Sequence, residues 1–160
     1  GSVVVVVSME PMSMARTNLG ADEGRLRRIM QEVGSKAVVS SWSLGGHSLG
    51  GFAAMRLASV LQPSSLVLWG AADLPNTRTN LSSTDLPVIV IQGSCDEFCR
   101  MDDSSNFQKD FPQSTRYMTI SGGVHNQFGS YTDSMGESKI SNRKFHKKLS
   151  SITAKFLNRR

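Results

Sequence analysis

The sequence is poor in cysteine, with only two in 160 residues. Cys95 and Cys99 stand in the stretch GSCDEFCR, and neither a second cysteine pair nor a nearby histidine pair accompanies them. The four sulfur or imidazole ligands of a structural zinc site are therefore not available. We expect both cysteines to be reduced thiols rather than a disulfide. Such low cysteine usage is consistent with the reducing cytoplasm but leaves the localisation open.

Long hydrophobic runs are also missing. The longest, Val3–Val7, has five residues, whereas a membrane-spanning helix needs about 20. No secretory signal is visible, because no basic segment followed by a long apolar stretch opens the chain. The chain does not begin with methionine, so a cloning remnant at Gly1-Ser2 and a piece of a longer protein are both open. It has no internal repeat and no domain boundary, and we expect a single domain over residues 1–160.

The net charge of +5 comes largely from the C-terminal stretch NRKFHKKL and the final two arginines. A run of cations at this spacing is typical of the solvated face of a helix. A nucleic-acid binder would interleave stacking aromatic side chains with its cations, and this stretch has only Phe145 and Phe156. We therefore expect no nucleic-acid partner.

Apolar runs alternate with helical patterns along the chain. Val3–Val7 shows no polar alternation, which is typical of a strand buried on both faces of a parallel sheet. Further predicted strands are residues 37–44, 65–71, 87–93 and 115–120, and predicted helices are residues 21–33, 52–61, 102–111 and 140–157. This alternation predicts a three-layer α/β domain with a mostly parallel sheet of about five strands.

The stretch GHSLG places Ser48 where the predicted strand 37–44 meets the predicted helix 52–61. It matches G-x-S-x-G, a sharp strand-to-helix turn that lifts the serine hydroxyl clear of the sheet. Gly46 and Gly50 are expected to be glycine because a Cβ at either position would clash where strand and helix approach each other. The turn also places the N–H of Leu49 at the start of the helix, where it can stabilise an oxyanion.

A serine nucleophile needs a histidine base and an acid that orients the base, in the chain order Ser, Asp/Glu, His for this turn. Asp96 directly follows the strand 87–93, and His125 lies in the glycine-rich loop after the strand 115–120. Groups at the carboxyl ends of parallel strands gather at one sheet edge. We therefore predict that Asp96 and His125 act with Ser48. The competitors are Glu97, Asp102 and Asp103 for the acid, and His47 and His146 for the base.

The chain resembles the α/β-hydrolase superfamily, most closely a subgroup of bacterial, plant and fungal members. In that subgroup the serine motif reads GGHSLGG and the histidine motif reads G-G-x-H-x-Q-F-G-x-Y, which are Gly45–Gly51 and Gly122–Tyr131 here. The histidine motif is the more specific of the two, because its Gln-Phe-Gly portion has no role in a generic triad. The resemblance implies a serine hydrolase of the esterase or lipase type. It would act through an acyl-enzyme on a small ester-like substrate, without a metal or an organic cofactor.

The resemblance also implies strands and a glycine-rich oxyanion loop that this chain does not carry ahead of Val3–Val7. That run matches the fourth strand of the family, and the third strand is missing. We therefore expect an N-terminally truncated domain with weak activity, because losing one oxyanion donor typically costs about 10² to 10³ in rate. An exposed sheet edge would also invite self-association.

The connection after Val3–Val7 is rich in methionine. Met9, Met12 and Met14 are expected to form an apolar acyl pocket, because flexible thioethers suit varied apolar groups. The opposing interpretation is that these side chains only pack under a loop. For the chain as a whole, the alternative to a hydrolase is a non-catalytic descendant that serves as a binding or scaffold protein.

Overall fold

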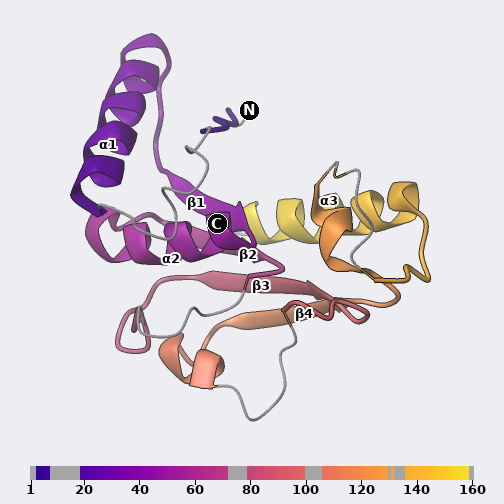
Figure 1. Ribbon diagram of the computed structural model, residues 1–160. Helices are drawn as coiled ribbons and strands as arrows, with labels where there is room; N and C mark the ends of the chain where they lie inside the picture. The colour runs from indigo at the N-terminus through magenta and orange to yellow at the C-terminus, as the bar shows by residue number, and fades with distance from the viewer. Residues whose placement is uncertain are drawn as a thin grey trace.

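The computed structural model describes residues 3–7, 19–71, 79–99, 106–129, 131 and 136–158. Helices and strands alternate along the chain (Figure 1). The elements in chain order are α1 (Leu19–Lys36), β1 (Ser43–His47), α2 (Leu49–Leu61), β2 (Ser65–Trp69), β3 (Val88–Gly93), η2 (Asn106–Asp110), β4 (Arg116–Ile120), η3 (His125–Phe128) and α3 (Asn142–Leu157). Within the described part of the chain, no helix combines the length and apolarity needed to cross a bilayer.

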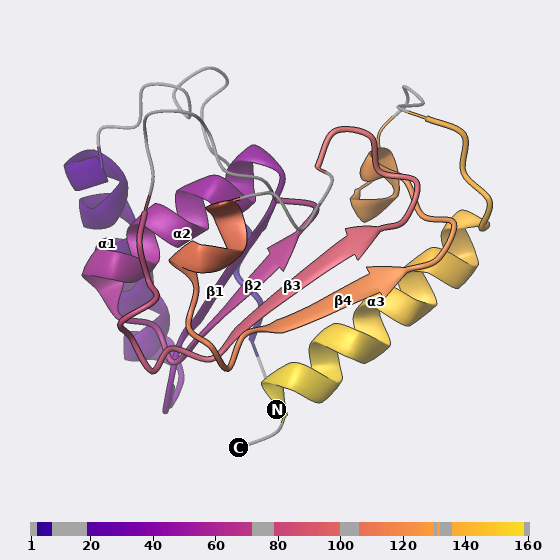
Figure 2. The ribbon, with the colours of Figure 1, turned by 90° about the horizontal axis from the view of Figure 1, so that it is seen from below.

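The four strands form one open sheet in the order β1-β2-β3-β4, and every neighbouring pair is parallel. Helices flank both faces: α1, α2 and η2 lie on one side and α3 on the other (Figure 2). The prediction of a layered α/β domain with a parallel sheet is therefore confirmed. Among the described residues the sheet has four strands, which is close to the expected number of about five, and Val3–Val7 is not one of them.

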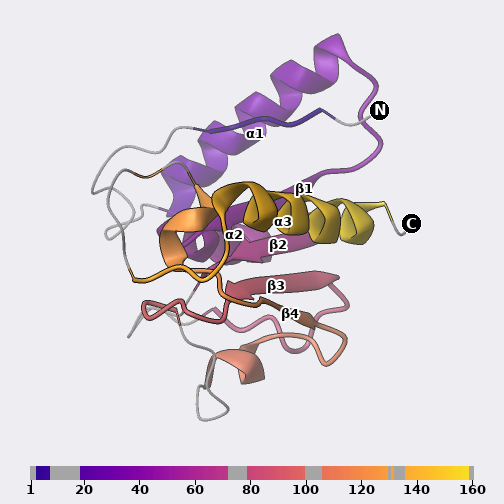
Figure 3. The same cartoon turned by 90° about the vertical axis from the view of Figure 1, so that its right-hand side faces the viewer.

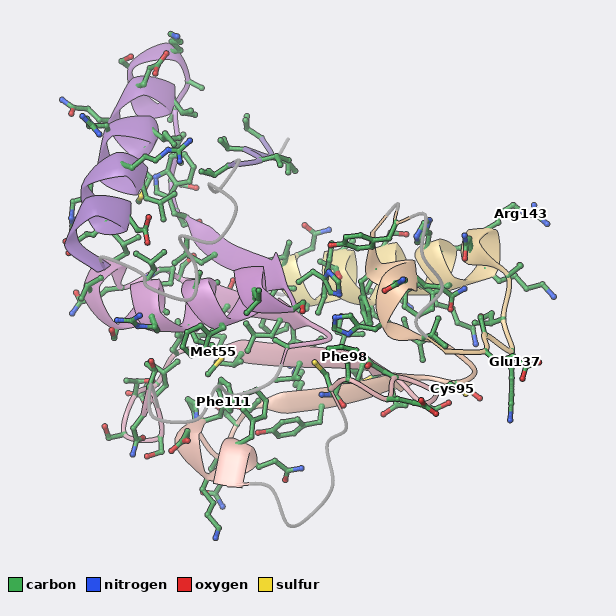
Figure 4. All side chains as sticks on the ribbon, in the orientation of Figure 1. Met55, Cys95, Phe98, Phe111, Glu137 and Arg143 are labelled. Atoms are coloured by element: carbon green, nitrogen blue, oxygen red, sulfur yellow. The ribbon has the colours of Figure 1, made fainter. Side chains whose placement is uncertain are left out.

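The first core layer lies between α2 and the sheet. Met55 and Ala58 of α2 pack against strand side chains such as Leu68, and Phe111 closes the layer beyond η2. Met55 and Phe111 are both drawn in this layer in Figure 4. Burying this apolar surface stabilises the fold by about 25 cal/mol per Å². It holds α2, and the turn at Ser48 that precedes α2, against the sheet.

The second core layer lies between α3 and the opposite sheet face. Phe145 and Leu149 of α3 are buried against Ile91 and Ile120, and Phe128 of η3 joins them. Phe145 and Leu149 therefore lie on the face of α3 that packs against the sheet. Because η3 shares this layer, the position of His125 depends on the docking of α3.

The Val3–Val7 run is exposed and lies outside the sheet (Figure 3). Val4 and Val6 are 85% and 89% exposed, so the prediction of a buried strand is wrong. A β-branched run favours extended backbone, but it becomes a strand only where another strand offers a free edge with covering layers. Residues 3–7 pair with no strand among the described parts of the chain, and four of the five are exposed.

The strand expected over residues 37–44 begins later, at Ser43, and continues through the glycines to His47. Val38 is fully exposed, and residues 37–42 have no regular structure. Pairing with β2 decides this shift, because the register aligns Ser43 with Ser65 and His47 with Trp69. The predicted helix 102–111 is likewise reduced to the short η2, with residues 102–105 outside the described part.

Among the described strands, β4 forms one edge of the sheet and β1 forms the other. Among the described residues, no strand pairs with its outer side, and its side chains alternate between exposed and half-buried. An unpaired edge of this kind presents backbone donors and acceptors to other chains. Self-association through this edge stays a prediction.

Candidate active site

Ser48 occupies a strained turn between β1 and α2. Its backbone angles are φ 53° and ψ −122°, a left-handed conformation that side chains other than glycine rarely adopt. Such a conformation costs about 1–3 kcal/mol and persists only where the surrounding structure holds it. Here the Ser48 N–H donates to the Trp69 carbonyl at 3.0 Å, and the Ser48 carbonyl accepts the N–H of Phe52 at 3.1 Å. Strand pairing and helix initiation therefore both hold the serine in this turn.

Two of the glycines around Ser48 leave no room for a side chain. A Cβ on Gly46 would lie 2.2 Å from the Gly50 carbonyl, and a Cβ on Gly51 would lie 2.6 Å from the Cβ of Ala71. A Cβ on Gly50 would meet nothing within 4 Å, so the prediction that Gly50 must lack a side chain is wrong. The close approach is between the Cβ position of Gly46 and the backbone of Gly50, so it does not require Gly50 itself to lack a side chain.

His125 reaches the serine from the turn that follows β4. It is the first residue of η3, and its side chain is 6% exposed. Its Nε2 lies 2.9 Å from the Ser48 Oγ. The chain passes from β4 to η3 through Gly122, whose φ of 79° is suited to glycine. The serine and the histidine therefore meet although 77 residues separate them.

Asp96 completes the row of hydrogen bonds from the carboxyl end of β3. Its Oδ2 lies 2.9 Å from the His125 Nδ1, and its Oδ1 accepts the N–H groups of Phe98 and Cys99, each at 2.9 Å. Burial acts to raise the pKa of this carboxyl. Together, the hydrogen bonds from His125 and from the Cys99 and Phe98 backbone and the attraction to the His125 ring outweigh burial, so the pKa lies below its ordinary value.

The charge on Asp96 decides the tautomer of His125. A carboxylate can only accept hydrogen bonds, so the proton of a neutral ring must be on Nδ1. Nε2 is then an acceptor and points at the Ser48 hydroxyl. The arrangement is that of a serine, a base that can take its proton and an acid that orients the base.

Among the competing acids, Glu97 is exposed, whereas Asp96 is 2% exposed and contacts the histidine. Asp102 and Asp103 lie outside the described residues. Of the other histidines, His146 lies on α3, and its Nε2 donates to the Gln127 carbonyl at 2.7 Å. The structure thus brings together Ser48, His125 and Asp96 of the predicted set.

A family model described as the alpha/beta hydrolase family matches residues 1–148. The chain belongs to this family. The resemblance inferred from the serine and histidine motifs is thereby confirmed at the level of the superfamily. The sequence matches no curated protein significantly.

Solved structures of similar fold are longer than this α/β hydrolase. An alpha-beta serine hydrolase homologue from Coxiella burnetii has a TM-score of 0.59 and 16% identity over 87% of this chain and 58% of its own. A predicted CIB-like hydrolase from Thermoplasma acidophilum has a TM-score of 0.63 and 14% identity over 91% and 64%. The monoacylglycerol lipase of Paleococcus ferrophilus has a TM-score of 0.57 and 15% identity over 88% and 76%. The chain thus spans about 60% of the length of the first two, and at these identities the likeness concerns the fold.

His47 of the α/β hydrolase lies beside the site rather than in the row of hydrogen bonds. Its ring centroid is 4.6 Å from that of His125, and it stacks on Phe128 at 5.4 Å. Its Nδ1 lies 3.1 Å from the Tyr131 hydroxyl. Burial, followed by repulsion from the His125 ring, lowers the pKa of His47 to about 4. His47 is therefore neutral near pH 7 and adds no positive charge beside His125.

The depressed pKa of His47 predicts a loss of stability in mild acid. The unfolded chain takes up the proton below its ordinary pKa of 6.5, while the folded chain resists it down to about 4. The free energy of unfolding therefore falls as the pH drops through this window. Asp96 contributes only below its ordinary pKa of 3.8. We expect His47→Phe, which keeps an aromatic ring on Phe128, to flatten the decline. Urea unfolding from about pH 7 to about pH 5 measures the free energy of unfolding of both proteins. An equal decline with pH in the two proteins would contradict the expectation.

Asp96, Cys99 and His125 also offer metal-ligand atoms, which lie within 4.8 Å of one another. The same Asp96 and His125 atoms are already joined by a hydrogen bond. Burial and the nearby Asp96 charge raise the pKa of the Cys99 thiol to about 12, which disfavours the thiolate that a metal requires. This donor set therefore fits the hydrogen-bonded arrangement better than a metal ion.

Cys95 and Cys99 are both free, and they should react at different rates. Cys99 is buried, and with a pKa of about 12 it holds almost no thiolate at neutral pH, whereas Cys95 is half-buried. We expect a thiol reagent such as iodoacetamide to modify Cys95 in the folded protein and both cysteines in urea. Peptide mass mapping distinguishes the two sites. A Cys95→Ser variant serves as the control, because it should show no modification before unfolding.

Of the remaining predicted site residues, the structure describes Leu49 but not the three methionines. Leu49 is the first residue of α2, and the first N–H groups of a helix have no acceptor within the helix. Its side chain is 42% exposed. The three methionines of the predicted acyl pocket, Met9, Met12 and Met14, lie outside the described residues.

Sequence reasoning missed two aromatic neighbours of the site. Phe98 is 67% exposed, and its ring centroid lies 5.5 Å from that of His125 (Figure 4). Tyr131 is 60% exposed and contacts His47. Tyr131 closes the histidine motif and could have been singled out there. Nothing in the sequence distinguishes Phe98, because its place follows from the turn that Asp96 makes.

Proposed function

We propose that this α/β hydrolase is a serine hydrolase of the esterase or lipase type, which acts through an acyl-enzyme on an ester-like substrate. The observation that carries the proposal is the continuous row of hydrogen bonds from the Ser48 Oγ through both nitrogens of His125 to Asp96. Both contacts are 2.9 Å long, within the reach needed for proton transfer.

In the first half-reaction the Ser48 Oγ attacks the ester carbonyl carbon while its proton passes to the His125 Nε2. Asp96 stabilises the imidazolium that forms, because its carboxylate accepts the Nδ1 proton in a hydrogen bond. The N–H of Leu49 stabilises the negative oxygen of the tetrahedral intermediate. The bond to the alcohol oxygen then breaks, and His125 returns the proton to the leaving alcohol.

In the second half-reaction water repeats the sequence on the acyl-enzyme. His125 takes a proton from water as the water oxygen adds to the acyl carbon. The bond between the acyl carbon and the Ser48 Oγ then breaks, His125 returns the proton to the Ser48 Oγ, and the carboxylic acid is released. The residues use no metal and no organic cofactor in either half. The role of Met9, Met12 and Met14 as an acyl pocket remains part of the proposal.

Exposed apolar side chains beside the serine support a substrate with apolar groups. Leu49 adjoins the nucleophile, Phe98 lies against His125, and Tyr131 lies against His47. Large exposed apolar side chains gathered at one place commonly mark a binding surface. They would contact the acyl or alcohol part of an ester.

A fluorophosphonate probe tests the proposal, because it forms a covalent bond only with an activated serine. We expect stoichiometric labelling at Ser48 by peptide mass spectrometry, no labelling of Ser48→Ala and much slower labelling of His125→Ala. A folded protein that takes up no probe would overturn the proposal. The non-catalytic binding or scaffold descendant would then be the better account.

A further inference from the structure

The side chain of Gln127 joins the histidine turn to the segment that leads into α3. Gln127 is 5% exposed. Its Oε1 accepts the Val124 N–H at 3.1 Å, and its Nε2 donates to the Ile140 carbonyl and to the Asn142 Oδ1, each at 2.8 Å. Because an N–H can only donate and a carbonyl can only accept, these partners determine which way the amide points.

Two further contacts complete this set. The Ser138 Oγ lies 2.9 Å from the Gln127 Oε1, 2.6 Å from the Ile140 carbonyl and 3.4 Å from the Gly122 carbonyl, so these acceptors share its single proton. The Gln127 backbone carbonyl accepts from the His146 Nε2 at 2.7 Å. Gln127 therefore connects η3 by hydrogen bonds to Val124, which precedes η3, to Ile140 before α3 and to α3 itself.

None of these hydrogen bonds reaches Ser48 or Asp96, yet they act on the residue between them. Val124 immediately precedes His125, and Gln127 lies in the same short helix. His125 must keep two contacts of 2.9 Å at once, one from each ring nitrogen. A displacement of about 1 Å at a reacting group can cost about 10² in rate, so the anchoring of this turn decides whether both contacts persist.

We infer that Gln127 is a positioning residue, which holds the His125 ring between Ser48 and Asp96 by fastening the histidine turn to α3. The inference rests on the proposed function. It also assigns a role to the Gln-Phe-Gly portion of the histidine motif, which the triad leaves unexplained. Phe128 packs edge-on against Phe145 of α3 at 4.9 Å, so the polar and apolar halves of that portion fasten the same turn.

The test replaces Gln127 by methionine, which has similar length and no hydrogen-bonding amide. We expect kcat, and the rate of fluorophosphonate labelling, to fall about 10²-fold while KM changes less than about twofold. The ¹H NMR signal of the His125 Nδ1 proton, which the Asp96 bond shifts far downfield, should broaden or disappear.

Gln108→Met is the matched control, because it makes the same change in η2, which packs on the opposite face of the sheet. It should leave all three readouts unchanged. Asn142→Ala removes one contact of Gln127 from an exposed position and should lower kcat only a few-fold. It also carries the test if Gln127→Met does not fold.

A folded Gln127→Met protein with unchanged kcat and an unchanged downfield proton would overturn the inference and leave Gln127 as a stabilising residue only. If the unmodified protein neither takes up the probe nor hydrolyses esters, the proposed function fails. The NMR signal then still decides the positioning role, because the His125–Asp96 bond exists independently of turnover.

Discussion

Ser48→Ala is expected to abolish hydrolysis of a small activated ester such as p-nitrophenyl acetate while leaving the fold intact. The substitution removes the nucleophile of the proposed acyl-enzyme, together with the hydroxyl proton that the His125 Nε2 would take. Loss of a triad serine costs on the order of 10⁶ in rate in competent enzymes. We therefore expect hydrolysis by Ser48→Ala to fall to the buffer background.

The stability of Ser48→Ala should differ from that of the unmodified protein by no more than about 1 kcal/mol, because Ser48 is half-buried and the change removes one side-chain hydrogen bond, to the His125 Nε2. Urea unfolding measures this difference. Ser59→Ala makes the same change at an exposed position of α2, where the hydroxyl donates to the Arg56 carbonyl, and should retain full activity. Hydrolysis that persists in purified Ser48→Ala would show that another group is the nucleophile.

Gly46→Ala is expected to destabilise the protein by about 2–3 kcal/mol and to lower the labelling rate at Ser48 at least about 10²-fold. The new Cβ would lie 2.2 Å from the Gly50 carbonyl and 2.6 Å from the Gly51 nitrogen. Both are backbone atoms, so no rotamer change relieves the clash, and β1 must separate from α2. This separation would move the serine away from His125.

Gly50→Ala, at a nearby glycine, is expected to leave the stability and the labelling rate intact, unlike Gly46→Ala. Its Cβ would meet nothing within 4 Å, and its φ lies outside the left-handed region. Within a helix, alanine is favoured over glycine by up to about 1 kcal/mol. We expect unchanged or increased stability, with the labelling rate retained. Urea unfolding of the two variants side by side tests the assignment, and equal losses would contradict it.

The predicted fold class followed from patterns that the local sequence carries. The apolar runs before Gly70 and Gly93 became β2 and β3, which are almost fully buried, since side chains without alternation must be covered on both faces. The same reasoning placed Val3–Val7 in the sheet wrongly. It also placed the serine strand too early, because a β-branched run does not specify its partner.

The sequence by itself indicated which residues the proposed chemistry would use. The glycine-flanked turn at Ser48, the chain order that puts Asp96 and His125 after later strands, and the histidine motif are local or ordinal properties of the chain. Only the tertiary structure decided that Asp96 rather than Glu97 faces the histidine. It also decided that Gly51 rather than Gly50 needs to lack a side chain, and that Gln127 fastens the turn to α3. These outcomes depend on distances between segments that are far apart in the chain. The packing of α2 and α3 on the sheet sets these distances, and no local sequence pattern encodes them.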